Sequence, residues 1–167
     1  MTSERPSTPG VAQVRAALLA DVAGIARFQT DCWREAYRGV VPQDYLDRVS
    51  YADRELRWRE RLLTGARQIA LAEADNAVAG VVSWRTIATQ DAPALELASL
   101  YVAAAQRSSG LATRLLHAAI GMRPAHLWVF EDNPRAHAFY TKQGFAFDGH
   151  RKHDPDTGLS EQRYVRR

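Results

Sequence analysis

One corner of the chain constrains its fold and chemistry more than any other. An apolar, strand-like segment at residues 95–105, LELASLYVAAA, passes into QRSSGLATRLL at residues 106–116. Ser108, Ser109 and Gly110 offer almost no side chain for packing, so the backbone there must be reachable for another reason. The first amides of a helix lack internal partners and carry the positive end of the helix dipole, and phosphates bind at such ends. The corner predicts an anion-binding turn, and a plain small-residue loop is the alternative.

The same corner excludes two common phosphate motifs. A P-loop needs Gly-Lys-Ser/Thr at the helix start, and this chain has Leu111-Ala112-Thr113 there. The dinucleotide fingerprint needs three glycines within six residues, and only Gly110 is present. ATP and NAD are therefore poorly supported as ligands.

Composition narrows the class of protein. The chain has 167 residues, 46% apolar and 25% charged, which suits one domain with a real core. A net charge of +3 is too small to argue for nucleic acid. The single cysteine, Cys32, excludes an internal disulfide framework and a Cys-based zinc site. No apolar run approaches the ~18 residues of a membrane span, and we expect a cytoplasmic protein with a flexible leader at residues 1–10.

The pattern of apolar residues and turn signals predicts an α/β (α+β) fold with the element order β-α-α-β-β-β-α-β-α-β-β. Antiparallel hairpins and one β-α-β crossover imply a mixed, mostly antiparallel sheet of about seven strands with helices on both faces. A helix from Pro42 is expected to continue to Leu63, and Asn133-Pro134 is expected to start a short helix that Gly144 ends. The segment HRKH at 150–153 reads as a loop without a third metal ligand, so no metal site is expected.

Two motifs together resemble a known family. RSSGLA at 107–112 resembles the Arg/Gln-x-x-Gly-x-Gly/Ala motif of the GNAT superfamily, the acyl-CoA-dependent N-acyltransferases. NPRAHAFYTKQGF at 133–145 resembles a second signature, Asn-x-x-Ala-x-x-x-Tyr-x-x-x-Gly-Phe. The resemblance spans roughly residues 11–167 and implies a GNAT fold over that range. It also implies an N-acetyltransferase that takes acetyl-CoA as its cosubstrate.

The resemblance assigns the coenzyme contacts by position. Backbone amides that bind the coenzyme diphosphate are expected from Arg107, Ser108, Ser109, Gly110, Leu111 and Ala112, with a hydroxyl from Thr113. The preceding strand is expected to separate from its neighbour and to pair with pantetheine through Leu100, Tyr101 and Val102. The amide of Val102 would also serve the carbonyl oxygen of the thioester. Asn133 either contacts the pantetheine arm or is purely a helix cap.

The resemblance also implies catalytic candidates. Tyr140 occupies the tyrosine position of the family and would donate a proton to the departing thiolate; a core aromatic is the alternative. Glu96, within an apolar strand, would be the general base, and an exposed carboxylate on a half-wet strand is the alternative. Ribosomal-protein acetyltransferases carry their glutamate at a position that matches Trp128 here, which argues against their mechanism. Glu131 and Asp132 remain other possible bases.

The acceptor is expected to lie against the N-terminal helices, with walls from Trp33, Tyr37 and Tyr45, each of which could equally be core. The expected reaction is acetylation of a primary amine of a small molecule by direct attack in a ternary complex. Two alternatives stay open: a catalytically weak acyl-CoA-binding module and a protein or peptide acetyltransferase. Neither nucleic acid nor membrane is expected as a partner, and the edges of the C-terminal strands permit a homodimer.

Overall fold

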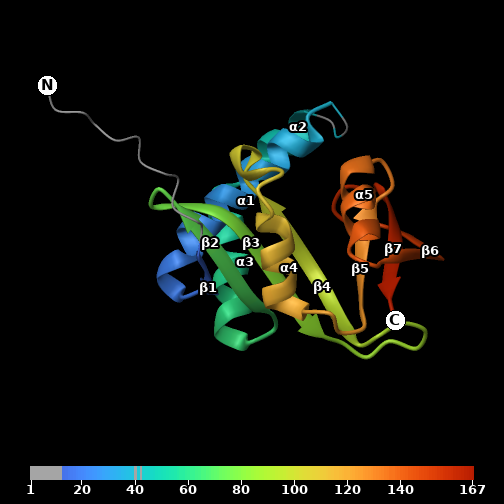
Figure 1. The fold of residues 1–167 in the computed structure, drawn as a ribbon. Coiled ribbons are helices and arrows are strands. Elements are labelled where there is room, and N and C mark those ends of the chain that lie inside the picture. Colours follow the sequence, from blue (N-terminus) through green and yellow to red (C-terminus); the bar gives the residue numbers. More distant parts are fainter. Residues whose placement is uncertain (1–12, 40, 42) are drawn as a thin grey trace, which may run out of the picture.

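A seven-stranded sheet forms the centre of the computed structural model, which describes residues 13–39, 41 and 43–167. The expected leader and Pro42 lie outside these residues. The strand order is β1-β2-β3-β4-β5-β7-β6 (Figure 1). The strands are β1 (Gln13–Ala16), β2 (Gln68–Ala74), β3 (Ala77–Thr86), β4 (Leu95–Val102), β5 (Ala125–Phe130), β6 (Ala146–His153) and β7 (Ser160–Arg166).

All strand pairs are antiparallel except β4 with β5, so the expected mixed sheet and GNAT-type order are confirmed. The helices are α1 (Val22–Tyr37), α2 (Gln43–Arg48), α3 (Tyr51–Thr64), α4 (Leu111–Ile120) and α5 (Pro134–Lys142). Within the described residues, no helix has the length and apolar character that a membrane crossing requires.

Two local expectations are corrected. The single helix expected to run to Leu63 is two helices, because Ser50 has extended backbone angles and caps α3 by accepting from the Asp53 amide at 3.1 Å. The HRKH segment is part of β6 rather than a loop: Arg151, Lys152 and His153 pair with β7. Because β6 is an edge of the sheet, the homodimer stays a prediction.

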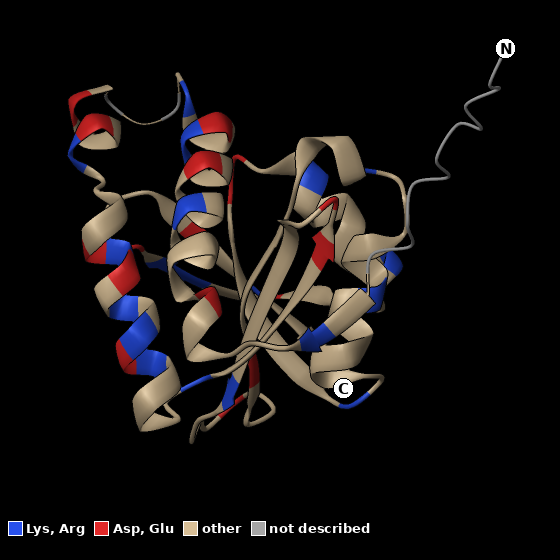
Figure 2. Cartoon of the chain, turned by 90° about the vertical axis from the view of Figure 1, so that its left-hand side faces the viewer, with Lys and Arg blue, Asp and Glu red and all other residues tan. Residues whose placement is uncertain are grey.

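The helices cover both faces of the sheet. One core cluster joins α4 and α5 to the sheet and includes Leu111, Leu115, Tyr140 and Phe145. A second cluster packs α1 and α3 on the other face, around the fully buried Trp58. Figure 2 shows that charged residues crowd along the helices of this second face and are sparse on the central strands. Because α1 and α3 carry so many charged residues, they must contact the sheet through a narrow stripe of apolar side chains.

Glycine at position 80 lets α4 lie close to the sheet. A Cβ built there would lie 2.6 Å from Leu115 Cδ1, closer than real Cβ atoms approach, and 3.2 Å from the Tyr101 carbonyl oxygen, which is tighter than most real contacts. Leu115 is fully buried, so it has no free space into which to move. The absence of a side chain at Gly80 therefore fixes the height of α4 above β3 and β4, and with it the corner that precedes α4.

We predict that Gly80→Ala lowers the free energy of unfolding by about 1–3 kcal/mol, because it overpacks the core beneath α4. The matched control is Gly24→Ala in α1, where the new Cβ would meet only Val78 Cγ2 at an ordinary 3.5 Å. That control should gain about 0.5–1 kcal/mol from lower chain entropy in the unfolded state. Urea denaturation of both variants checks the pair, and equal stabilities would contradict the packing argument.

Candidate active site

The corner before α4 has the form of an open anion-binding turn. Ser108 and Gly110 take positive φ values of 65° and 82°, and a Cβ at Gly110 would meet nothing within 4 Å. Within the described residues, the amides of Ala112 and Thr113 donate to no other group, as expected for a first helical turn. The expected small residues thus leave donors reachable at the positive end of α4.

Three residues of this corner are already engaged. The guanidinium of Arg107 lies 2.8 Å from a Glu35 carboxylate oxygen of α1, and the Arg107 amide donates to the Ala104 carbonyl. The Ser109 hydroxyl donates to the Gln106 carbonyl and accepts a long 3.3 Å bond from the Leu111 amide. A bound diphosphate would have to displace that weak bond, whereas the donors of Ala112 and Thr113 need no rearrangement.

The two central strands separate directly beside this corner. Strand β4 is joined to β5 by one residue pair, Glu96 with His126, and beyond it the two strands diverge (Figure 1). A bulge contributes: Ser83 pairs with Ser99 and Trp84 with Leu97, which leaves Ala98 unmatched and bends β4. The edge of β4 that faces β5 therefore carries unpaired backbone groups along Leu100, Tyr101 and Val102, while the other edge pairs with β3.

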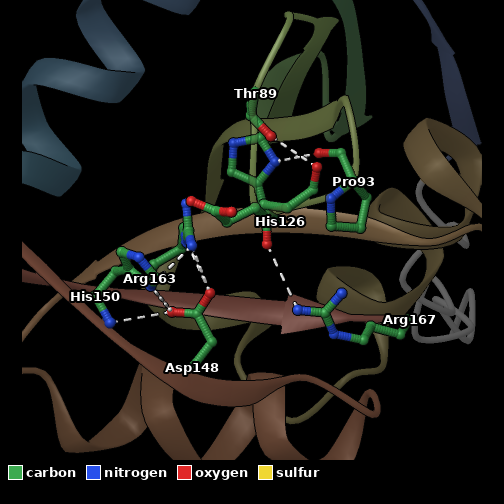
Figure 3. A network of polar contacts seen from close by, with 9 residues as sticks. Thr89, Pro93, His126, Asp148, His150, Arg163 and Arg167 are labelled. Carbon is green, nitrogen blue, oxygen red and sulfur yellow. Dashed lines mark hydrogen bonds and ion pairs between the residues drawn. The ribbon is translucent and has the colours of Figure 1, made fainter.

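The point where the strands meet is braced by polar contacts. The buried His126 has Nδ1 at 2.6 Å from the Pro93 carbonyl oxygen, so Nδ1 carries a proton and donates. Arg163 of β7 donates to Asp148 of β6 at 2.8 Å and contacts Nδ1 of His150, also on β6, at 2.8 Å (Figure 3). The His126 contact therefore ties the start of β5 to the segment before β4, and the contacts of Arg163 join β7 to β6.

Tyr140 lies on α5. It is buried and packs edge-on against Phe139 and Phe145, with ring centroids 5.1 and 5.9 Å apart. Burial, with a smaller contribution from the phenol of Tyr101, raises the pKa of Tyr140 above its ordinary value. The ring of Tyr140 is therefore part of the core, which is the alternative role considered for it. Its hydroxyl stays protonated at neutral pH and lies near the phenol of Tyr101 on β4.

Glu96 lies at the meeting point of the two strands and is buried, 6% exposed. Its carboxylate pairs with the guanidinium of Arg85 on β3. It is therefore not the exposed carboxylate of the alternative reading. Glu131 is exposed and bonded to Gln162 at 2.9 Å, and Ser160 and Gln162 hold its pKa below the ordinary value, which makes it a weaker base.

A pocket of about 320 Å³ opens between α1, the end of β5 and the start of β7. Its lining includes Tyr37, Phe130, Asp132, Asn133 and Ser160, so it contains an expected acceptor residue and an expected coenzyme residue. It includes neither Glu96 nor Tyr140.

The Asn133 side chain accepts from the Ala136 amide at 3.1 Å, so the cap alternative is present in the geometry. One lone pair of Asn133 is thereby used, and its side chain also hydrogen-bonds the Tyr37 phenol, which opposes the rise that burial causes in the pKa of Tyr37.

The three expected acceptor walls come together. Trp33 contacts Tyr37 and Tyr45 with ring centroids 4.8 and 5.6 Å apart, in a cluster that also includes the partly buried Tyr101. Tyr37 stands edge-on to Phe130 at 5.1 Å, across the separation from α1 to β5. The three side chains expected to form the acceptor wall therefore also form a small core, which is the alternative role considered for them.

Sequence reasoning missed the charges on this side. Arg54 and Arg61 extend from α3 and Arg67 follows the helix, each partly buried near the phenol of Tyr101. The sequence did contain a pattern that indicates these charges, because Arg54, Trp58 and Arg61 have the spacing of residues on one helix face. No group of three or more His, Cys, Asp or Glu in the described part of the chain is placed to hold a metal ion.

Residues 25–145 match the family described as the Acetyltransferase (GNAT) family, which is most of the chain. The chain belongs to the GNAT acetyltransferase family. It is 30% identical over 128 residues to an uncharacterized N-acetyltransferase, YuaI, of Bacillus subtilis, covering 72% of this chain and 73% of that protein. As a GNAT enzyme it is an acetyl-CoA-dependent acetyltransferase.

Solved GNAT structures share the fold at low identity. The PaiA N-acetyltransferase of Thermoplasma acidophilum, in complex with coenzyme A, superposes with a TM-score of 0.70 at 20% identity, covering 92% of this chain and 99% of that one. YncA of Salmonella typhimurium, with acetyl-CoA, gives 0.65 at 18% identity and covers 93% of both chains. At these identities the likeness establishes the fold.

The two roles of Asn133 can be separated by substitution. We predict that Asn133→Ala lowers the free energy of unfolding by about 1 kcal/mol because α5 loses its cap, whereas Asn133→Ser keeps the cap and most of the stability. Thermal and urea denaturation measure this difference. If Asn133 also contacts the coenzyme, Asn133→Ser should bind CoA more weakly at unchanged stability, and calorimetric titration with CoA decides that second role.

Proposed function

We propose that this GNAT enzyme transfers the acetyl group of acetyl-CoA to the primary amine of a small molecule, by direct attack within a ternary complex. The observation that carries the proposal is the separation of β4 from β5 beyond a single residue pair. It leaves strand edges unpaired between the free amides of α4 on one face and the aromatic cluster of α1 on the other. A linear coenzyme arm and an amine can thus meet between the strands from opposite faces.

Coenzyme binding is assigned to the corner and to the edge of β4. The amides at residues 107–112 and the Thr113 hydroxyl would hold the diphosphate at the positive end of α4. The backbone of Leu100, Tyr101 and Val102 would pair with the pantetheine arm. The amide of Val102 would donate to the thioester carbonyl oxygen as negative charge develops there.

Three proton transfers complete the reaction. Glu96 would accept a proton from the acceptor ammonium, directly or through water, so that a neutral nitrogen attacks the thioester carbon. As the carbon–sulfur bond breaks, Tyr140 would donate its phenolic proton to the sulfur, and the second proton lost by the acylated nitrogen would return to Tyr140 through water. The raised pKa of Tyr140 suits a proton donor, because the phenol carries its proton throughout the neutral and mildly alkaline range.

A small acceptor is favoured over a protein by the size of the pocket, about 320 Å³, and by its aromatic wall. An α-amine of pKa near ~8 is about a tenth neutral at pH 7, whereas a lysine-like amine of pKa ~10.4 is almost wholly charged. The weak-binding-module alternative keeps the coenzyme contacts and lacks any dependence on Tyr140 or Glu96.

Coenzyme binding should stabilise the fold by mass action. At a concentration 100 times the dissociation constant, CoA should add about 2.7 kcal/mol, which is several degrees in a thermal-shift assay. Gly110→Ala should lose most of this shift, because at φ 82° a side chain strains the turn that presents the amides.

The matched control for that variant is Gly65→Ala, which ends α3 at φ 67° with equally open space around it. It should cost similar intrinsic stability and keep the full CoA-dependent shift. Absence of any shift with CoA or acetyl-CoA in the unaltered protein would overturn the proposal.

Loss of the two side chains should affect turnover more than binding. We predict that Tyr140→Phe and Glu96→Gln each lower kcat by about 100-fold with little change in CoA affinity. The control Arg85→Gln removes the same ion pair from the other side and should keep kcat within about threefold. Turnover followed by thiol release tests this, and equal losses for Glu96→Gln and Arg85→Gln would make Glu96 a structural partner only.

A further inference from the structure

An ion pair joins the corner before α4 to the helix that carries the aromatic cluster. The guanidinium of Arg107 lies 2.8 Å from a carboxylate oxygen of Glu35, which is 72 residues away along the chain. Arg107 belongs to the corner, and Glu35 belongs to α1. The contact therefore connects two parts of the chain that the proposed function assigns to different substrates.

Glu35 extends from a part of α1 that packing holds in place. It lies between Trp33 and Tyr37 in sequence, whose rings contact each other at a centroid distance of 4.8 Å and belong to one core cluster. Residues two apart do not share a helix face, and the Glu35 side chain is accordingly half exposed. The carboxylate therefore has a fixed origin beside the corner without being part of the aromatic cluster.

Arg107 supplies the only charged side chain of the corner, because residues 106–113 read QRSSGLAT. The free donors there are the neutral amides of Ala112 and Thr113. A carboxylate next to a guanidinium cancels most of the attraction that the guanidinium exerts on another anion. As long as Glu35 holds Arg107, the corner thus offers little net charge to a coenzyme that carries several phosphates.

The geometry of the pair permits an exchange of partners. Within the described residues only Nη2 of the guanidinium is engaged, so Nε and Nη1 remain free to donate. The Arg107 amide already donates to the Ala104 carbonyl at 3.1 Å, so only the side chain has to move. The two side chains are 38% and 50% exposed, and water weakens ion pairs of that kind. A phosphate, with several charged oxygens, can therefore replace the single carboxylate contact.

We infer that Glu35 is an internal competitor for a phosphate of CoA: it occupies the guanidinium of Arg107 in the free enzyme, and the coenzyme displaces it. The inference rests on the proposed function and adds a residue that sets the affinity for the coenzyme. After the exchange, Arg107 donates to phosphate oxygens beside the amides of α4. Glu35 is left as an unpaired carboxylate near the bound coenzyme, which lowers the affinity.

The competition acts alike on acetyl-CoA and on CoA, because both carry the same phosphates. It therefore weakens the binding of the product as much as that of the cosubstrate. Release of product limits turnover in many enzymes, so a corner that is partly neutralised from within favours exchange of spent CoA for acetyl-CoA.

The first test removes the charge of Glu35 and keeps its shape. Glu35→Gln should bind CoA about threefold more tightly in a calorimetric titration, as expected for loss of an exposed ion pair. Its melting temperature without CoA should stay close to that of the unaltered protein. The matched control is Glu55→Gln, which removes a carboxylate from the exposed pair with Arg59 on α3 at 3.1 Å and should leave CoA affinity unchanged.

Three ligands locate the phosphate. CoA and 3′-dephospho-CoA should gain equally from Glu35→Gln if Arg107 binds the diphosphate, whereas a gain confined to CoA assigns the 3′-phosphate. Pantetheine has no phosphate and should gain nothing in either case. A gain with pantetheine, or a gain of the same size in Glu55→Gln, would contradict the inference.

A double-mutant cycle tests the exchange itself. Arg107→Gln should bind CoA more weakly, and Glu35→Gln should improve CoA affinity more in the unaltered protein than in the Arg107→Gln background, where there is no ion pair to break. An equal or larger gain in the Arg107→Gln background would mean that Glu35 only repels the coenzyme. A crystal structure with CoA in which Arg107 stays on Glu35 and contacts no phosphate would also overturn the inference.

These outcomes are separable from the fate of the proposed function. If Glu35→Gln leaves CoA affinity unchanged or weakens it, Glu35 is not a competitor, while a CoA-dependent thermal shift of the unaltered protein still supports the proposed function. Failure of CoA to bind the unaltered protein would overturn the proposed function itself, and the inference with it.

Discussion

Strands β4 and β5 are parallel neighbours that share one residue pair, Glu96 with His126. A sheet that gives up ladder hydrogen bonds in its interior leaves backbone groups without partners, and buried groups of that kind are costly. The bulge at Ala98 and the His126–Pro93 contact keep the departure in one place. The candidate site depends on this separation, because it leaves the edge of β4 along Leu100, Tyr101 and Val102 without a partner strand.

The two faces then divide the chemistry by charge. The α4 face supplies backbone donors at a helix start, which suit a diphosphate without requiring buried cations. The α3 face carries guanidiniums that lie over the rings of Trp33 and Trp58, so its charges are held by aromatic contacts rather than by backbone donors.

Much of the fold was predictable because its signals are local. Asn133-Pro134 caps α5, Gly110 provides a left-handed corner, and the apolar periods outline the strands. The break at Ser50 was missed because both flanking segments favour helix and a cap is a single residue. The site was only partly predictable: motif positions located Glu96 and Tyr140, but the Arg85–Glu96 pair depends on strand register. No local pattern reports which residues meet across strands.

The arginines of α3 illustrate why long-range contacts decide the environment of a side chain. In sequence, Arg54 and Arg61 resemble the outer charges of a solvated helix, indistinguishable from Arg59, which does face outward and pairs with Glu55. Only the burial of Trp58 between them turns that side of the helix inward, where the guanidinium of Arg61 lies over the Trp58 ring and that of Arg54 lies over the Trp33 ring. A stability-driven sequence would fill such a face with leucine, because partly buried like charges oppose folding.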